Sequence, residues 1–142
     1  MNRTDQHKSY KETQIKTANQ GKLIVMLYDG AIKYLNLALD SMHETDKNYD
    51  AISNNIIKVQ DIVTELMVSL DFERGGEISK NLFSLYVFMN HQLLEANIRK
   101  NINPLSEVKA LLLELRSAWV EVSERRDLES RTGQGGGVNI AG

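Results

Sequence analysis

The hydrophobic pattern between residues 23 and 35 differs from that of an ordinary surface helix. This segment has the sequence LIVMLYDGAIKYL. At about 100° per residue on an α-helix, its polar residues Asp29 and Lys33 form one narrow strip, which Asn36 and Asp40 continue. Nearly all of the remaining circumference is apolar, whereas a surface helix usually buries a single apolar stripe. The segment therefore carries more apolar surface than one packing interface requires.

Helical spacing of apolar residues dominates the rest of the chain, without strand-like alternation. The pattern predicts four helices, at about residues 20–43, 50–71, 77–100 and from the Asn103-Pro104 pair to about 126. Asn19 is the expected N-cap of the first helix. Gly75-Gly76 is expected to supply a left-handed cap after the second helix. Asn103 followed by Pro104 is a typical start signal for a helix.

Four helices of about twenty residues with short connections predict an all-α fold, an antiparallel up-down-up-down four-helix bundle. Residues 1–18 are mostly polar and are predicted to be a flexible N-terminal arm, in which Tyr10 and Ile15 are isolated apolar residues. Residues 19–126 are predicted to form the bundle as a single domain. The Gly-rich stretch 127–142 has the composition of a flexible, disordered tail.

Each predicted helix has one apolar stripe suited to the core of a bundle. The expected core residues are Ile24, Leu27, Ala31, Leu35, Ala38 and Met42, then Ile52, Ile56, Val59, Val63, Leu66 and Leu70, then Ile78, Leu82, Leu85, Met89, Leu93 and Ala96, and finally Val108, Leu112, Leu115, Trp119 and Val122. Gly30 lies within the first helix, where glycine costs about 1 kcal/mol relative to alanine. The expected reason for Gly30 is the close approach of another segment.

Further apolar residues remain once these stripes are assigned. Phe83, Val87, Leu94 and Ile98 align on the third helix, roughly opposite its core face, and the other candidates are Ile57 and Val68, Leu113 and Val120, and Val25 and Ile32. Scattered surface hydrophobes are normal, and this interpretation suits residues such as Ile57 or Val25 taken singly. A continuous strip favours a partner site, for example a groove that accepts an amphipathic helix.

Composition narrows the classes of function. The chain has 142 residues, 42% hydrophobic and 25% charged, as is typical of a globular domain. The net charge of −2 disfavours nucleic-acid binding, and without cysteine neither disulfides nor thiolate sites can form. No apolar signal region and no run of about 20 apolar residues is present, so we expect a cytoplasmic protein that does not insert into membranes.

The sequence does not favour catalysis, a metal site or a cofactor. His7, His43 and His91 are far apart. Asp40 and His43 resemble half of a di-iron motif, but such a site needs two Glu-x-x-His units and further glutamates. The glycines at 133 and 135–137 lack the Lys-Ser/Thr pair of a phosphate-binding loop. We therefore expect no enzyme activity.

The residues resemble the FliS family of flagellar export chaperones. LIVMLYDGAIKYL is similar to the family's first-helix signature, and further similar motifs follow in order at 71–78, 81–86, 93–97 and 108–119. The arm around Tyr10 is also similar, so the resemblance covers residues 10–123. Family members often have Asn-Arg-Arg where this chain has Asn90-His91-Gln92, which makes the third helix less basic at that point.

The resemblance implies a cytosolic chaperone that binds the C-terminal segment of flagellin, prevents its premature polymerisation and helps to deliver it to the flagellar type III export gate, the cytoplasmic domain of FlhA. A client wrapped around a small bundle would explain the surplus apolar surface. The client-binding residues are then expected to be Ile57, Val68, Phe83, Val87, Leu94, Ile98, Leu113 and Val120. A complex of one chaperone with one flagellin is expected.

Two other functions stay open at this stage, as does the role of the arm. The chain could be another type III export chaperone or adaptor with a different client, or a small bundle enzyme or ligand carrier. For the arm, we expect Tyr10 and Ile15 to cover part of the client groove in the free protein, with a frayed terminus as the alternative. The resemblance adds that the family's N-terminal tyrosine is associated with docking to the export gate.

Overall fold

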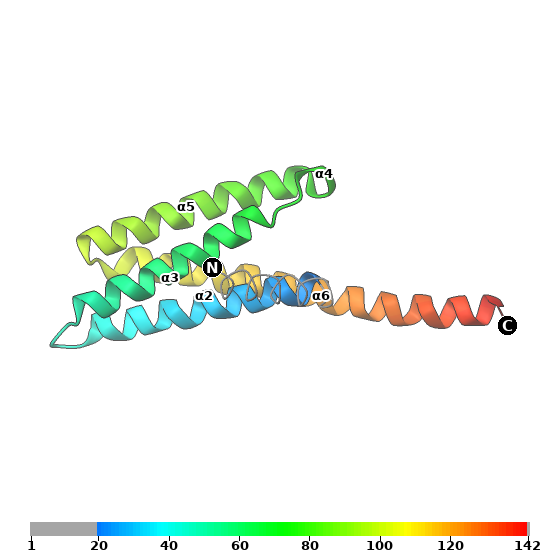
Figure 1. Ribbon diagram of the computed structural model, residues 1–142, viewed down its shortest axis with the longest axis horizontal. Coiled ribbons are helices and arrows are strands. Elements are labelled where there is room, and N and C mark those ends of the chain that lie inside the picture. The colour runs from blue at the N-terminus through cyan, green and yellow to red at the C-terminus, as the bar shows by residue number, and fades with distance from the viewer. Residues whose placement is uncertain (1–19, 142) are drawn as a thin grey trace, which may run out of the picture. The chain divides into compact units, whose positions relative to one another are not determined.

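The computed structural model describes the backbone of residues 20–141 and the side chains of residues 20–129. The described chain is helical and contains no strand, which confirms the predicted all-α class. Its elements, labelled as in Figure 1, are α2 (Gln20–His43), α3 (Tyr49–Val68), α4 (Phe72–Gly75), α5 (Glu77–Arg99) and α6 (Ile102–Ala141). Asn19, Tyr10 and Ile15 lie outside the described residues.

The described chain contributes to two compact units, which are considered separately. One consists of Leu27–Leu115 and the other of the two chain ends, up to Met26 and from Arg116 onward. In the Leu27–Leu115 unit the long helices run in alternating directions in chain order (Figure 1), as an up-down-up-down bundle requires. Short connections produce this arrangement, because they leave no room for a parallel crossover. The boundaries predicted for a single domain at 19–126 stay a prediction.

The core of the Leu27–Leu115 unit contains two tyrosines that the apolar stripes do not predict. Tyr28 and Tyr86 are almost completely buried, whereas Leu27 and Leu85, the residues preceding each, are only half-buried. A step of one residue turns the buried face of a helix by about 100°, so each helix presents a larger ring to the core. The other fully buried side chains of this unit are mostly aliphatic: Ala31, Leu35, Ala38, Ile52, Ile56, Val59, Val63, Leu66, Met89, Leu93, Ala96, Leu105, Val108 and Leu112.

Two residues predicted to be core residues are exposed. Ile78 is 70% exposed, because Ser79 takes the inward position at the start of α5 and donates a hydrogen bond to the Asp71 carbonyl oxygen at 2.8 Å. Val122 is also exposed, while Ser123 is buried instead. The prediction for both positions was wrong, because spacing alone cannot identify a small polar residue that takes the inward position.

The segment between α3 and α5 differs from the sequence prediction. The second predicted helix reaches residue 71, but α3 ends at Val68 and a separate short helix, α4, follows. The Asp71 carboxylate accepts hydrogen bonds from the backbone N–H groups of Glu73 and Arg74, and therefore caps α4. Because the Asp71 cap starts α4, the apolar pattern that continues past Val68 does not extend α3.

Both ends of α6 also differ from the prediction. Asn101, not Asn103, caps its start, with the Asn101 side chain accepting from the Asn103 N–H at 3.0 Å. Pro104 is therefore still in the first turn, where its missing N–H costs nothing. At the other end, α6 continues to Ala141 instead of ending near 126. The residues after 126 contain helix formers and no cap before Gly133, so the backbone has no local reason to stop earlier.

Gly30 allows α2 and α3 to approach each other closely. A Cβ atom at Gly30 would lie 3.3 Å from the Cδ1 atom of Ile62 on α3, closer than ordinary van der Waals contact. This confirms that the glycine accommodates a neighbouring segment. Near the same interface, the Lys58 ammonium lies 4.8 Å from the centre of the Tyr34 ring, which is a cation–π contact between the two helices.

Candidate functional site: an apolar groove between two helices

Four side chains form an exposed apolar strip on α5. Phe83, Val87, Leu94 and Ile98 are all exposed, from 41% for Phe83 to 69% for Ile98. At about 100° per residue, the strip lies roughly a third of a turn from the buried face of α5 and not opposite to it. Hydrogen bonds between the two helices show that α3 packs beside the strip.

Asn90 and Thr64 connect this strip to α3. On α5, Asn90 lies between strip residues, with Val87 three positions before it and Leu94 four positions after it, so the three share one helical face. On α3, Thr64 shares a face with Ile57, seven positions before, and Val68, four positions after. The Asn90 Nδ2 atom donates to the Thr64 Oγ1 atom at 3.3 Å, which brings the two faces together.

A second set of polar contacts joins the same helices near the end of α5. The Ser53 hydroxyl donates to the Asn97 Oδ1 atom at 2.8 Å. Lys100 caps the C-terminus of α5 in a left-handed conformation with φ 49°. Its Nζ atom donates a hydrogen bond to the Ser53 Oγ atom at 2.8 Å. An ammonium group is favourable at a helix C-terminus, so this cluster fixes the spacing between α3 and α5 at one end.

The short helix α4 adds an aromatic ring at the other end. The rings of Phe72 and Phe83 are 6.0 Å apart, at an interplanar angle of 64°, which is an edge-to-face contact. We call the surface formed by these residues the α3–α5 groove; its apolar members are Ile57 and Val68 of α3, Phe72 of α4, and Phe83, Val87, Leu94 and Ile98 of α5. The sequence pattern does not identify Phe72, because it belongs to no helical stripe.

Local geometry around two glycines positions α4. A Cβ atom at Gly75 would lie 1.8 Å from the Ser79 Oγ atom. Gly76 has φ +51° and ψ −122°, a backbone conformation that suits glycine. The chain can therefore turn directly from α4 into α5 while Ser79 holds the Asp71 carbonyl, and this turn places Phe72 against Phe83.

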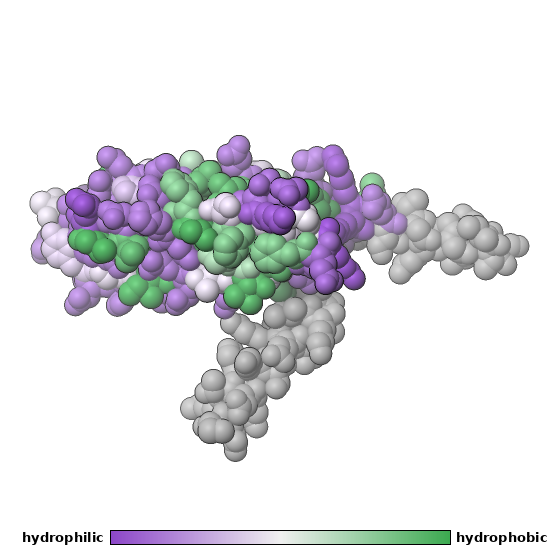
Figure 2. Space-filling model, turned by 90° about the horizontal axis from the view of Figure 1, so that it is seen from above, coloured by the Kyte–Doolittle hydropathy of each residue, from purple (hydrophilic) through white to green (hydrophobic). Residues whose placement is uncertain are grey.

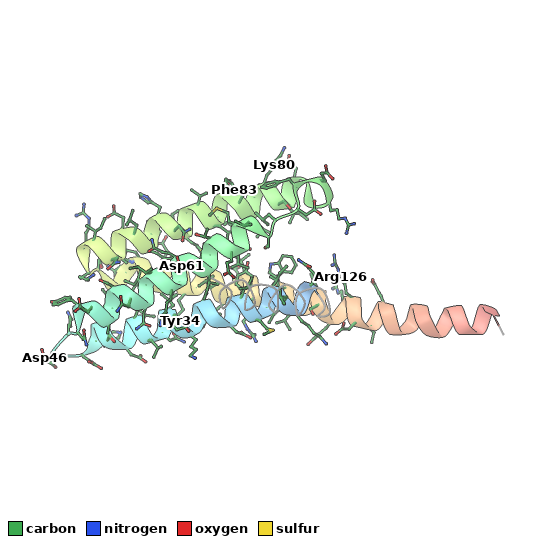
Figure 3. All side chains as sticks on the ribbon, viewed as in Figure 1. Tyr34, Asp46, Asp61, Lys80, Phe83 and Arg126 are labelled. Atoms are coloured by element: carbon green, nitrogen blue, oxygen red, sulfur yellow. The ribbon has the colours of Figure 1, made fainter. Side chains whose placement is uncertain are left out.

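The face of the molecule formed by α4 and α5 combines apolar and polar side chains. Figure 2 views the molecule from this side and shows hydrophobic residues gathered between hydrophilic ones. Figure 3 labels Phe83 on α5, with Lys80 one turn before it, and Asp61 on α3. Lys80 pairs with Glu77, with 3.6 Å between Nζ and Oε1. Such an exposed pair adds little stability, so the charges serve mainly to border the apolar surface.

The remaining predicted client residues lie elsewhere. Leu113 is exposed on α6, a helix that contributes no residue to the α3–α5 groove as defined above. Val120 is only half-buried and belongs to the unit formed by the chain ends, where it lines a hollow of about 380 Å³ together with Val25 and Met26. The ion pair between Lys22 and Asp127, 3.1 Å apart, lies at this hollow. The structure thus brings together six of the eight predicted residues, namely Ile57, Val68, Phe83, Val87, Leu94 and Ile98.

Other features of the described part of the chain concern metal clusters, membrane-spanning helices and shifted pKa values. Among the residues with described side chains, no group of three or more His, Asp or Glu residues could hold a metal ion. Within the same part, no helix is both long enough and apolar enough to cross a membrane. A clear pKa shift appears for Tyr86, where burial raises the pKa and the Tyr28 hydrogen bond opposes that effect. Both tyrosines are core residues, so this shift concerns stability.

The described chain is all-α and exposes a strip of apolar side chains, a feature that favours a partner site. The family model of flagellar protein FliS matches residues 2–126. The chain is 34% identical over 130 residues to the flagellar secretion chaperone FliS of Bacillus subtilis strain 168, covering 90% of this chain and 92% of that protein. It is 35% identical over 111 residues to the Escherichia coli K12 chaperone FliS, covering 78% of this chain and 80% of that protein.

The chain is also 38% identical over 112 residues to the flagellar secretion chaperone FliSB of Pseudomonas aeruginosa PAO1. The match covers 79% of this chain and 87% of that protein. The chain belongs to the FliS family. This confirms the resemblance of residues 10–123 and supports a role as a flagellar export chaperone. The relatives are named as chaperones and not as enzymes.

Proposed function

We propose that this protein binds the C-terminal segment of flagellin in the cytosol and keeps it from polymerising before export. The observation that carries the proposal is the α3–α5 groove, an apolar surface left uncovered in a protein of the FliS family. Exposed apolar strips of this kind are unfavourable in water. A partner that covers them gains that free energy on binding.

The groove suits an amphipathic helix as its occupant. It follows α5 from Phe83 to Ile98, fifteen residue steps that correspond to about 22 Å at 1.5 Å per residue. A client helix of about four turns would cover that length. A segment that folds on binding loses conformational entropy, which its buried apolar surface must offset. Aligned apolar side chains over that length provide this surface more readily than isolated residues.

Delivery to the export gate completes the proposed role. The chaperone would dock on the cytoplasmic domain of FlhA, with the arm that contains Tyr10 and Ile15 making that contact. Leu113 and Val120 are also proposed to contact the client, so that flagellin would bind apolar residues on more than one helix. No cofactor or nucleotide is needed, because transfer to the gate can release the client.

A pull-down with the host's flagellin tests the proposal. Full-length flagellin should bind, whereas flagellin without its last ~40 residues, a length that covers an interface of standard area, should not. Equal binding of both forms would show that the C-terminal segment is not the client. If neither form binds but another exported flagellar protein does, the chain is an export adaptor with a different client.

Stoichiometry provides a separate test of the same proposal. The groove is too short to pair with a second bundle and still hold a client, so we expect one chaperone per flagellin. Light scattering at micromolar concentration should give the mass of a 1:1 complex. A stable 2:2 assembly would show that chaperone–chaperone contacts contribute to the complex.

A further inference from the structure

The α3–α5 groove consists of two apolar halves separated by a polar pair. Val68, Phe72, Phe83 and Val87 form one half, and Ile57, Leu94 and Ile98 form the other. The bonded pair of Thr64 and Asn90 lies between them. Along α5, Val87 and Leu94 are seven residues apart, a rise of about 10 Å, and Asn90 lies between these two residues on the same face.

The hydrogen bonds of this pair leave one acceptor unused. The Thr64 hydroxyl donates to the Gln60 carbonyl oxygen at 2.9 Å and accepts from the Asn90 Nδ2 atom. The Asn90 Oδ1 atom is buried and has no hydrogen-bond partner among the described residues. Buried polar atoms in native proteins are nearly always paired. An unpaired acceptor beside these apolar residues therefore suits a hydrogen-bond donor from outside the described residues.

We propose that Asn90 accepts a hydrogen bond from the bound client and thereby fixes the register of the client helix in the groove. This inference rests on the proposed function of the groove as a client site. The side-chain amide of Asn turns easily about its last torsion, so the Oδ1 atom can face the groove when a donor is present. The neighbouring Asp61, exposed on α3 three positions before Thr64, adds a second acceptor nearby.

The proposal predicts a sequence pattern in the client. The client helix should have two apolar residues one heptad apart, one for each half of the groove. A hydrogen-bond donor such as Asn, Gln, Ser, Lys or Arg should lie between them, three or four residues from each. A uniformly apolar groove would let a client helix shift by one turn at little cost. A single polar contact prevents that shift, as a buried Asn does in a coiled coil.

The test uses Asn90→Leu with Gln92→Leu as the matched control. Gln92 is on the opposite side of the groove wall, where it bonds Glu107 of α6 at 2.9 Å. With a peptide of the last ~40 flagellin residues as the probe, Asn90→Leu should weaken binding five- to tenfold and Gln92→Leu less than twofold. The melting temperature of Asn90→Leu should be unchanged or higher, since the unpaired acceptor is removed.

Register and rescue distinguish a specific hydrogen bond from general loss of affinity. Asn90→Asp keeps an acceptor and should retain wild-type affinity. One spin label is placed on the peptide and another at position 54 of α3, where Asn54 is exposed. The distance between the two labels should have a single value in the wild type and several values with Asn90→Leu. Wild-type affinity together with a single distance in Asn90→Leu would overturn the inference. If the peptide does not bind the wild type at all, the proposed function fails instead.

Discussion

The hydroxyl oxygens of Tyr28 on α2 and Tyr86 on α5 lie 2.5 Å apart inside the Leu27–Leu115 unit. Both rings are at most 1% exposed. A short O–H···O contact of this kind is a good hydrogen bond, and it allows two large aromatic rings to be buried without leaving either hydroxyl unpaired. This bond therefore fixes the pairing of α2 with α5 in the core that supports the groove.

The tyrosine pair makes the stability of the protein depend on alkaline pH. Burial raises the pKa of Tyr86 above its ordinary value of 10.0, against the opposing influence of the Tyr28 hydrogen bond. The neutral phenol therefore stabilises the fold fully below pH 10, and this contribution is lost as the pH rises through the raised pKa. Denaturant unfolding should show a free energy that falls above pH 10, with a shallower fall in Tyr86→Phe. Identical slopes would exclude Tyr86 as the titrating group.

Removing both hydroxyls should cost less than the sum of the costs of removing each one alone. Tyr28→Phe leaves the buried Tyr86 hydroxyl without its Tyr28 partner, and an unpaired buried hydroxyl costs about 1–3 kcal/mol. The double change to phenylalanine should be less destabilising than the sum of the single changes. Urea unfolding of the four variants of this cycle gives the coupling free energy. Additive losses would mean that the hydroxyls do not interact.

The interface at Gly30 should tolerate one methyl group but no larger side chain. In Gly30→Ala the gain in helix propensity, about 1 kcal/mol, opposes the close contact with Ile62, so stability should change by less than about 1 kcal/mol. Gly30→Leu should lose about 1–3 kcal/mol through overpacking. The matched variant Gly30→Leu/Ile62→Ala should regain part of that loss. No regain would mean that Ile62 is not the obstacle.

Groove residues should contribute client affinity and little fold stability. Changing Val87 and Leu94 to aspartate should abolish flagellin binding and shift the melting temperature by only a few degrees, because exposed substitutions usually change stability by about ±0.5 kcal/mol. Leu112→Ala is the contrasting variant: Leu112 is fully buried, and its truncation should cost about 2–5 kcal/mol. A collapse of the melting temperature in the aspartate variant would show that the groove is part of the core.

The turn between α4 and α5 should control how Phe72 is presented. Gly76→Ala places a side chain at φ +51° and should cost about 1–3 kcal/mol of stability. The neighbouring change Lys80→Ala keeps the backbone unaltered and serves as the control. Flagellin affinity, measured by titration calorimetry, should fall with Gly76→Ala and not with Lys80→Ala. Equal affinity for both would show that Phe72 is not needed for the client.

The N-terminal arm should compete with the client. If Tyr10 and Ile15 cover part of the groove in the free protein, deleting residues 1–15 should tighten flagellin binding several-fold, because a competing intramolecular state is removed. The same deletion should weaken binding of the complex to the FlhA cytoplasmic domain. Unchanged affinity, together with a Tyr10 amide as mobile in the free protein as in the complex, would favour a frayed terminus.

The hydrophobic pattern predicted the helices well because helical periodicity is a local property. The bounds of the first and third helices agree with α2 and α5 to within a residue. The unexpected α4 arises from a local competition: the Asp71 cap stabilises a new helix more than continuation of α3 does. Likewise, Asn101 and not Asn103 caps the start of α6. The sequence pattern cannot show which of two Asn residues so close together is the N-cap.

By itself, the sequence determined the all-α class, the order of the helices and the presence of surplus apolar residues on α3 and α5, because each depends on residue type and spacing along one helix. Only the tertiary structure decided which of those residues share a surface. The contact between Asn90 and Thr64 joins segments twenty-six positions apart, and Phe72 joins Phe83 through a turn. Such relationships depend on how helices rotate against each other, and a shift of one residue turns a face by about 100°.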